Sequence, residues 1–498
     1  MNSLWIDSVD ELSKFETLDK NLEADICIIG AGIFGMTCGY YLSHLGFKVI
    51  LIDKNHLGGA TCFTTGKITS QHGLFYSYLN TSYDMHFAKD YLEANEKAIK
   101  NIQDIINKEQ IDCDFEHQNS YIYTTKKEEI DLLKKEQKVL ESLGYQAELT
   151  SHVSLPFQVE TALCFKNQAK FNPLKYILGL AKTILQKNGQ IYTNTIAVDI
   201  EKDKKNYVVY TDNGNMIKTK HVIIATRYPF MNVPGFYFSK LYQSTSYIIA
   251  IDTKKELMQD MYINISSPIY SFRTAKFNGK DILLLASGNC KTGHDTSHED
   301  PYISLTNFAK QYYPDCNVLY KWSSEDCISL DKLPYIGKYS NLLPNVYVGT
   351  GFKKWGMTLS NVAANLIVDE ICERENPYTY LFDSTRFGLF KNFDEVKNMV
   401  VDSTNSLLLN KLKLSNSSIE NIKPDCGDII EIDGKKVGIY RDKEKQIHAI
   451  NPICTHLGCL LTWNNIDKTW DCPCHGSRYD CYGKNLYGPA FKDLEIYE

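Results

Sequence analysis

Two boxes of cysteine and histidine near the C-terminus constrain the fold of this chain more than any other feature. They read Cys454-Thr-His456-Leu-Gly-Cys459 and Cys472-Pro-Cys474-His475-Gly-Ser477-Arg-Tyr479, with the 15 residues 457–471 between His456 and Cys472. Each box can supply one thiolate and one imidazole, a ligand set suited to a [2Fe–2S] centre with sulfur on one iron and nitrogen on the other. Replacing two thiolates by neutral imidazoles removes negative charge and raises the reduction potential.

Two other interpretations of the boxes are weaker. Structural zinc sites commonly use the spacings C-x₂₋₄-C and H-x₃₋₅-H, whereas these boxes have C-x-H and C-x-x-H. A buried set of cysteines and histidines without a metal would not require Gly458, Pro473 and Gly476 beside the six Cys and His positions. The sequence therefore favours an iron–sulfur site.

The boxes resemble those of the Rieske [2Fe–2S] family residue by residue. The resemblance implies that Cys454 and Cys472 bind one iron and that His456 and His475 bind the other. In the high-potential branch of the family, the positions of Cys459 and Cys474 form a disulfide between the two loops. Ser477 and Tyr479 match the hydroxyl donors that tune the cluster, and Gly488-Pro489-Ala490 resembles the proline loop that shields it.

Length and composition describe an ordinary globular chain of several domains. The 498 residues predict two or three domains, with 43% hydrophobic and 23% charged residues. The net charge of −6 gives no electrostatic reason to expect a nucleic-acid partner. No apolar run approaches the length of a membrane span, and we expect none.

The N-terminus and the cysteines predict a cytoplasmic protein. The first 15 residues contain an early acidic pair and lack the basic and apolar regions of a signal peptide. Most of the 15 cysteines are scattered singly, unlike a secreted disulfide framework. We expect most of them to be reduced and buried.

A second chemical signature lies near the N-terminus. The apolar run 25–30 ends in a glycine-rich turn that predicts the entry to a helix, and a second apolar run over 48–53 ends in an acid. The turn and the acid predict a dinucleotide site formed by Gly30, Gly32, Gly35 and Asp53. In such sites the glycines allow the pyrophosphate to approach, and the acid bonds the ribose hydroxyls.

Further motifs resemble the flavoproteins related to D-amino-acid oxidase and glycine oxidase, here called the DAO family. They are Gly58-Gly59-Ala60-Thr61 through Gly66-Lys67, then Asp331-Lys-Leu-Pro334, and finally Gly351-Phe352-Lys-Lys-Trp355-Gly356-Met357-Thr358. The resemblance covers about residues 22–385 and implies FAD. The histidine that binds flavin covalently in the family is not evident near residues 61–66, so we expect the FAD to be non-covalent. The residues that the resemblance adds to the FAD site are Thr65, Val198, Gly351, Gly356, Met357 and Thr358.

One position departs from the DAO pattern. The segment His221-Val-Ile-Ile-Ala225-Thr226-Arg227 resembles the end of a family strand, but Arg227 replaces the usual glycine. Glycine adopts positive φ readily and arginine does not, so the departure puts the local backbone geometry in doubt. No second GxGxxG motif occurs, and we expect no separate NAD(P)H site.

These motifs predict three regions. An α/β (α+β) Rossmann-like FAD-binding part is expected at 22–80, 160–235 and 325–385, with a β-rich substrate part at 81–159 and 236–325, so that residues 1–385 form one DAO-like oxidoreductase domain. A connecting helical segment is expected at 386–423. A small all-β Rieske domain is expected at 424–498, with a hairpin turn at Asp433-Gly434.

The combination predicts an enzyme that converts two-electron chemistry into single-electron transfer. We expect an amine or amino acid to lose hydride to FAD, and electrons to pass singly through the cluster to an external acceptor. The candidate catalytic residues are Lys67 and His72, which follow the glycine-rich turn, and Tyr247 and Arg273 on the expected substrate sheet. Arg273 could bind a substrate carboxylate through two hydrogen bonds.

Two alternatives stay open, and one class is not expected. The chain could be an electron-transfer component that oxidises no substrate itself, or a redox sensor that uses the cluster and the Cys459/Cys474 pair. A Rieske oxygenase would need a mononuclear iron site after the cluster, and only 23 residues follow His475.

Overall fold

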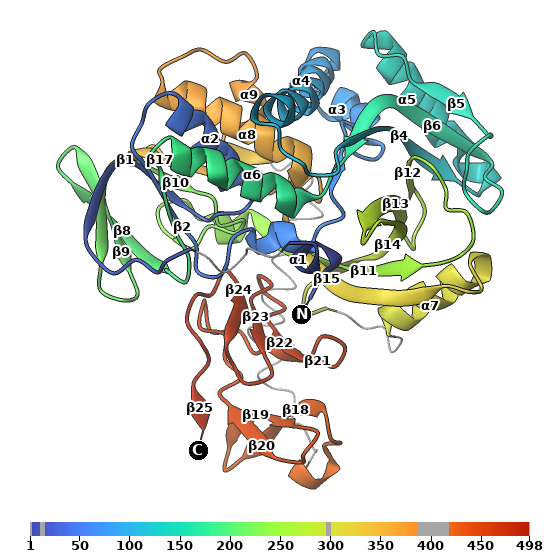
Figure 1. Ribbon diagram of the computed structural model, residues 1–498. Helices are drawn as coiled ribbons and strands as arrows, with labels where there is room; N and C mark the ends of the chain where they lie inside the picture. The colour runs from blue at the N-terminus through green and yellow to red at the C-terminus, as the bar shows by residue number, and fades with distance from the viewer. Residues whose placement is uncertain (1, 10–14, 295–299, 387–417, 498) are drawn as a thin grey trace.

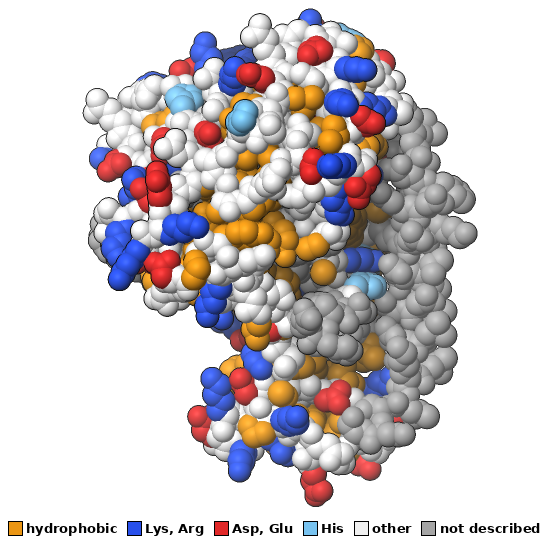
Figure 2. Space-filling view, turned by 90° about the vertical axis from the view of Figure 1, so that its right-hand side faces the viewer, with side chains coloured by type: hydrophobic (Ala, Val, Ile, Leu, Met, Phe, Trp, Pro, Cys, Tyr) orange, Lys and Arg blue, Asp and Glu red, His pale blue; other side chains and the backbone are white. Residues whose placement is uncertain are grey.

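The computed structural model describes residues 2–9, 15–294, 300–386 and 418–497 (Figure 1). Two large sheets and their helices form the main body, and a smaller domain made of strands projects from it. Figure 2 shows this smaller domain as a separate lobe below the main body, with a waist between them. Among the described residues, no helix is long and apolar enough to cross a membrane.

The first sheet has the order β16-β17-β10-β1-β2-β7, and β8 and β9 extend it beside β10. The pairings from β17 to β7 are parallel. Both faces of such strands are covered, which explains the continuous apolar runs in β1 and β2. The elements are β1 (Leu22–Ile29), β2 (Val49–Ile52), β7 (Gln190–Tyr192), β8 (Ala197–Asp203), β9 (Asn206–Thr211), β10 (Met216–Ile224), β16 (Tyr335–Ser340) and β17 (Leu343–Thr350), with helices α2 (Ile33–His44), α6 (Pro173–Gln186) and α8 (Gly356–Ile371).

The second sheet has the order β15-β11-β14-β13-β12-β4-β6-β3, with β5 beside β6. Its long antiparallel strands β11, β14 and β15 lie next to the C-terminal domain (Figure 1). The strands are β3 (Lys67–Ile68), β4 (Glu116–Thr124), β5 (Glu148–Thr150), β6 (Thr161–Lys170), β11 (Leu241–Asp252), β12 (Met261–Asn264), β13 (Tyr270–Phe277), β14 (Lys280–Lys291) and β15 (Asn317–Ser329). The remaining helices of the main body are α1 (Leu4–Asp7), α3 (Phe75–Ser82), α4 (Met85–Glu109), α5 (Ile130–Ser142), α7 (Pro301–Tyr312) and α9 (Thr379–Phe382).

The C-terminal domain consists of two four-stranded sheets. The first contains β18 (Cys426–Ile432), β19 (Lys435–Arg441), β20 (Ile447–Ile450) and β25 (Ile496–Tyr497), and the second contains β21 (Thr462–Asn464), β22 (Thr469–Asp471), β23 (Arg478–Asp480) and β24 (Asn485–Tyr487). Asp433 and Gly434 join β18 to β19 with φ of 50° and 73°. Positive φ at both positions is what a two-residue hairpin turn of type I′ requires.

Two predicted boundaries differ from the structure. The segment 160–170 was expected in the FAD-binding part, but β6 belongs to the second sheet because it pairs with β4 and β3. The expected end of the substrate part at 325 cuts β15, which continues to Ser329 alongside β11. Most of the predicted connecting segment 386–423 lies outside the described residues.

Candidate functional site

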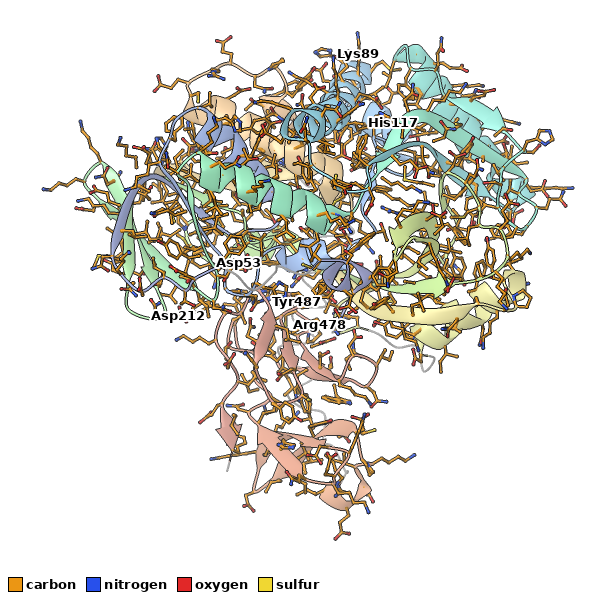
Figure 3. The ribbon with its side chains drawn as sticks, in the orientation of Figure 1. Asp53, Lys89, His117, Asp212, Arg478 and Tyr487 are labelled. Carbon is orange, nitrogen blue, oxygen red and sulfur yellow. A yellow bond between two sulfur atoms is a disulfide. The ribbon has the colours of Figure 1, made fainter. Side chains whose placement is uncertain are left out.

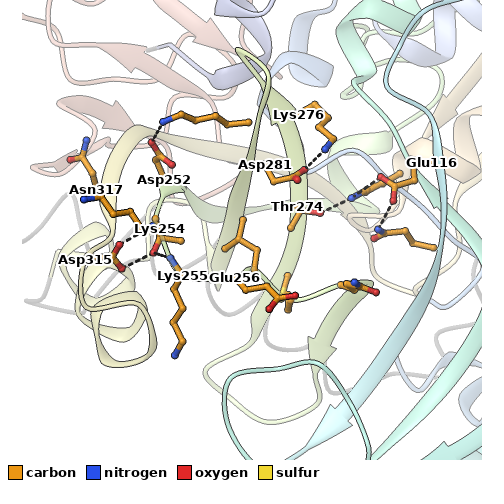
Figure 4. A pocket seen from close by; sticks show the side chains of 17 residues that line it. Glu116, Asp252, Lys254, Lys255, Glu256, Thr274, Lys276, Asp281, Asp315 and Asn317 are labelled. Atoms are coloured by element: carbon orange, nitrogen blue, oxygen red, sulfur yellow. Dashed lines mark hydrogen bonds and ion pairs between the residues drawn. The ribbon is translucent and has the colours of Figure 1, made fainter.

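One cavity of the described structure lies at the second sheet. It has a volume of about 1090 Å³ and is lined by charged side chains from β13, β14 and the segment 252–259 (Figure 4). Lys276 pairs with Asp281 at 2.8 Å, and Lys280 pairs with Asp252 at 2.9 Å. Because these charges neutralise each other, the cavity is a weaker candidate than the cleft between the two sheets.

That cleft has a volume of about 400 Å³ and begins at the carboxyl ends of β1, β2 and β10. Ligands of α/β folds bind at this edge of the sheet. The C-terminal domain also contributes to its walls, through residues 486–491. Figure 3 shows Asp53 and Tyr487, which both line the cleft, at the junction between the main body and the C-terminal domain.

The glycine-rich turn exposes backbone to the cleft. Gly30 has a φ of 111°, and a Cβ there would lie 2.5 Å from the Ala225 carbonyl oxygen. A Cβ on Gly35 would lie 1.9 Å from the Gly30 carbonyl oxygen. Only glycine therefore fits the crossing of helix and strand. The Asp53 carboxylate accepts hydrogen bonds from the backbone N–H of Ala31 at 2.8 Å and of Asn55 at 2.9 Å, which fixes it at the cleft wall.

The predicted FAD residues divide into two groups. Those that line the cleft are Gly30, Gly32, Asp53, Gly351, Gly356 and Met357. Gly35 supports the turn from behind. The other three lie outside the lining. The Thr65 carbonyl accepts a hydrogen bond from Arg273, and the Thr358 hydroxyl donates one to the Thr69 carbonyl. Val198 lies on β8, one residue beyond Ala197. Their neighbours Thr64, Ala197 and Met357 line the cleft instead.

None of the four predicted catalytic residues lines the cleft. Lys67 donates to the Tyr262 carbonyl at 2.8 Å and to Ser271 Oγ at 2.7 Å, and burial lowers its pKa well below the ordinary value. The Tyr247 ring packs edge-on against Tyr302 in the core. Both side chains therefore have partners inside the protein.

His72 and Arg273 are also enclosed. His72 stacks on Trp355, and its two nitrogens lie 2.8 Å from Tyr91 Oη and the Thr69 carbonyl oxygen. Burial lowers the pKa of His72 to about 3, so the ring is neutral. The Arg273 guanidinium donates to the carbonyls of Thr65, Gly66, Phe171 and Thr274 at 2.7–3.1 Å. Because protein carbonyls occupy its donors, the geometry does not support Arg273 as a substrate clamp.

This arrangement predicts that Arg273→Met lowers stability and leaves substrate binding unchanged. The substitution leaves buried carbonyls without a hydrogen-bond donor. We expect the free energy of unfolding, measured in urea, to fall by about 2–4 kcal/mol. Arg374→Met is the control, because Arg374 is exposed and lies 3.9 Å from Asp369. An unchanged stability with a weaker substrate affinity would instead support the clamp.

The sequence did not single out Asp326 and Lys354. Asp326 lines the cleft, and the positive charges of Lys354 and Arg227 act to lower its pKa. Burial raises the pKa of Asp326 and lowers that of Lys354. Lys354 Nζ donates to Ser246 Oγ on β11 at 2.7 Å. Lys354 has a φ of 69°, a strained value for a lysine, and such strain gathers at functional sites.

Asp326 belongs to a run of four consecutive β15 residues, Ser324 to Cys327, that line the cleft. Successive side chains of β15 point to opposite faces, and Glu325 bonds Arg478 of the C-terminal domain at 2.6 Å. The Asp326 side chain points to the opposite face of the strand, and both residues line the cleft. The available sequence signal was a run of consecutive polar residues in each strand, 323–326 in β15 and 243–246 in β11. The structure pairs Asp326 with Ser244 and Ser324 with Ser246.

A second site lies in the C-terminal domain, where the two boxes meet. The imidazoles of His456 and His475 have ring centroids 5.0 Å apart. Within the described part of the chain, their Nδ1 atoms are buried without a hydrogen-bond partner. Burial lowers the pKa of His456 to about 4 and of His475 to about 3, so both rings are in the neutral form that binds metal.

The sulfur side of this site is equally enclosed. Cys454 and Cys472 are buried, and a hydrogen bond from Cys472 lowers the pKa of Cys454 to about 6. Two adjacent thiols and two imidazole nitrogens without a hydrogen-bond partner fit a [2Fe–2S] cluster. Cys472 also lies within 4.8 Å of the sulfurs of Cys459 and Cys474, but these two form a disulfide and are not free to bind metal.

Two hydroxyls border the predicted cluster ligands. Tyr479 Oη lies 3.5 Å from Cys454 Sγ and accepts the Thr455 N–H at 3.2 Å. Ser477 Oγ accepts the Ala490 N–H at 3.0 Å, which ties the loop at 488–490 to the second box. The predicted tuning role of these hydroxyls is compatible with these positions and stays a prediction.

Comparisons with known proteins match both parts of the chain. A family model described as FAD dependent oxidoreductase matches residues 25–370, and one described as Rieske [2Fe-2S] domain matches residues 417–498. The chain is 37% identical over 492 residues to the putative Rieske 2Fe-2S iron-sulfur protein YhfW of Bacillus subtilis (strain 168), covering 99% of this chain and 96% of that protein.

More distant relatives match the main body. Gamma-glutamylputrescine oxidoreductase of Escherichia coli (strain K12) is 21% identical over 407 residues, which cover 78% of this chain and 91% of that protein. The crystal structure of glycine oxidase from Geobacillus kaustophilus covers 74% of this chain and 99% of its own, with a TM-score of 0.62 and 18% identity. The matches confirm the predicted fold class and both predicted cofactors, FAD and the [2Fe–2S] cluster.

Proposed function

The chain belongs to the FAD-dependent oxidoreductase family and carries a Rieske domain, and on this premise we propose that it oxidises an amine or amino acid and relays the electrons singly to an external acceptor. FAD accepts two electrons as hydride, whereas a [2Fe–2S] cluster takes one at a time. The observation that carries the proposal is that residues 486–491 of the Rieske domain form part of the FAD cleft wall.

The substrate side of the proposal rests on Asp326 and Lys354. Oxidation of a C–N bond to C=N removes two electrons and two protons, one proton with the hydride and one from nitrogen. The Asp326 carboxylate would hold the substrate ammonium and take its proton. Lys354 lies between the lining residues Phe352 and Gly356, and its ammonium, which donates to Ser246 Oγ, would also bind the carboxylate of an amino acid. Water would then hydrolyse the imine.

The names of two relatives support this substrate class. Glycine oxidase and gamma-glutamylputrescine oxidoreductase are named for an amino acid and an amine. The proposed partners are thus a small-molecule substrate and an electron acceptor. The cytoplasmic location stays a prediction from the sequence.

Anaerobic titration of the purified protein with amines and amino acids tests the function. We expect one substrate class to bleach the flavin and then to reduce the cluster. If no compound bleaches the flavin, the substrate oxidation is wrong and the electron-transfer alternative is favoured.

Asp326→Asn tests the proposed substrate contact. The neutral amide cannot pair with an ammonium or take its proton, and we expect flavin reduction to need about 10- to 100-fold more substrate. The control is Asp252→Asn, because Asp252 lines the other cavity. Equal substrate dependence in both variants would remove Asp326 from the mechanism.

A further inference from the structure

Arg227 holds a backbone conformation that arginine rarely adopts. It follows β10 with a φ of 64°, at the position where the DAO pattern has glycine. A bulky residue with positive φ is strained, and such strain persists only where surrounding contacts hold it. Arg227 also lines the FAD cleft. Its side chain must therefore make contacts that offset the strain.

Those contacts lead to the Rieske domain. The guanidinium donates to the Glu325 carbonyl on β15 and, at 2.9 Å, to Gln243 Oε1 on β11. It also lies over the Tyr487 ring of β24, 4.9 Å from the centroid. Arg227 thus connects the cleft wall, the second sheet and the Rieske domain. A glycine at this position could make none of these side-chain contacts.

Gln243 continues the connection to the cluster loops. Its side chain is buried, and Nε2 lies 3.1 Å from the His475 carbonyl oxygen, 2.7 Å from that of Gly476 and 2.5 Å from that of Gly488. A Cβ on Gly476 would lie 2.6 Å from Gln243 Cβ, so the loop approaches as closely as a backbone can. One amide therefore fixes both the second box and the proline loop.

The predicted histidine ligands face the oxidoreductase domain. His456 Nε2 lies 2.7 Å from Asn232 Oδ1 of the main body. The Phe238 ring stands edge-on to both imidazoles, at 6.3 Å from His456 and 6.1 Å from His475. The imidazole side of the cluster site is thus docked on the oxidoreductase domain.

We propose that Arg227 and Gln243 form a bridge that holds the cluster loops at the FAD cleft, so that the cluster exchanges electrons with the FAD of its own chain across this contact. The inference rests on the proposed electron relay and adds its route. Each electron that crosses leaves the reduced flavin and enters the oxidised cluster, and an external one-electron carrier must reoxidise the cluster before the second crosses. Both residues are positioning residues, since they act by placing the loops.

The competing interpretation is that Arg227 and Gln243 only hold the two domains together. The domains are already held together by the buried pair of Arg478 with Glu325 and by the bond of 3.3 Å between Tyr302 and Asp467. A strained arginine in the cleft wall is not needed for adhesion. The test must therefore separate docking strength from electron transfer.

Photoreduction of the flavin with light and EDTA gives this separation, because it needs no substrate. In the parent we expect the electron paramagnetic resonance signal of the reduced cluster to appear with flavin bleaching. In Gln243→Leu and Arg227→Gly we expect the cluster to lag by about 10- to 100-fold, because displaced redox partners react slowly. Hydrogen exchange of residues 472–490 should rise in both variants.

Matched controls address folding and interface loss. Lys204→Gly replaces an exposed residue with a φ of 56° in the turn between β8 and β9. Tyr302→Phe removes an interdomain hydrogen bond away from the cluster loops. Both should behave as the parent. If Gln243→Leu does not load its cluster, the Arg227→Gly variant decides between the two interpretations. It retains the hydrogen bonds from Gln243 Nε2 to the cluster loops.

The proposal is overturned if the cluster follows the flavin at the parental rate in the variants that hold a cluster. It is equally overturned if Tyr302→Phe slows the cluster as much as Gln243→Leu does, since any weakened interface would then explain the delay. Failure of the substrate titration would leave the photoreduction result intact, so the two proposals fail separately.

Discussion

Cys472→Ser is expected to give a protein that keeps its FAD and holds no [2Fe–2S] cluster. Cys472 is fully buried beside Cys454, and its replacement leaves one thiolate for an iron that needs two protein sulfurs. The FAD cleft is lined by residues 486–491 of the same domain but not by Cys472 itself, so flavin binding should survive.

Iron analysis and the visible spectrum measure this result. We expect iron per chain to fall from two atoms to a background level while the flavin absorbance remains. Cys481→Ser is the control, because Cys481 is a half-buried free cysteine of the same domain outside both boxes. Cluster retained in Cys472→Ser, or lost in Cys481→Ser, would contradict the ligand assignment.

Arg478→Met is expected to have the largest effect on stability. Arg478 is buried among three carboxylates and pairs with Glu325 at 2.6 Å and with Asp467 and Asp471 at 2.8 Å. Glu325 comes from the main body and the other two from the Rieske domain. Removing the only arginine of this group leaves buried charges unpaired, which costs about 3–5 kcal/mol. Figure 3 shows Arg478 at the junction of the two parts.

The pH dependence of this variant has a definite sign. Burial already raises the pKa of Asp471 in the folded protein, and Arg478 opposes that rise. Without Arg478 the folded state binds protons in a range where the unfolded carboxyl, with a pKa of about 4, does not. Stability of the variant therefore falls as pH rises through this range, and the deficit should shrink between pH 7 and pH 5.

Calorimetry of the holoprotein at several pH values measures both effects. Arg441→Met is the control, because Arg441 is a half-buried arginine of the same domain that donates to the Ile419 carbonyl. A deficit that stays constant with pH would contradict the carboxylate explanation, and a deficit no larger than that of Arg441→Met would contradict the role of Arg478.

The sequence predicted the parts of both cofactor sites that are local. The glycine-rich turn and Asp53 belong to one strand–helix–strand unit, and the cluster ligands belong to two short boxes. In each case the spacing along the chain sets the geometry, because a turn or loop of fixed length carries the chemical groups. The hairpin at Asp433-Gly434 follows from the same principle.

The proposed substrate residue Asp326 was harder to predict because it comes from the second sheet. Lys67, His72, Tyr247 and Arg273 have suitable chemistry, but the fold uses them for internal bonds and packing. Whether a polar strand residue faces a cleft depends on register, and β11 and β15 contain register shifts that no local pattern reveals.

The sequence by itself determined the two cofactors, the family and the order of the parts, since each depends on short segments with fixed spacing. Only the tertiary structure decided how the parts meet. Arg227 and Gln243 lie more than 200 residues before Arg478 in the chain, and nothing in their local sequence shows that the three share one interface. Their roles arise because folding buries them against the other domain, where each charge and polar group requires a partner.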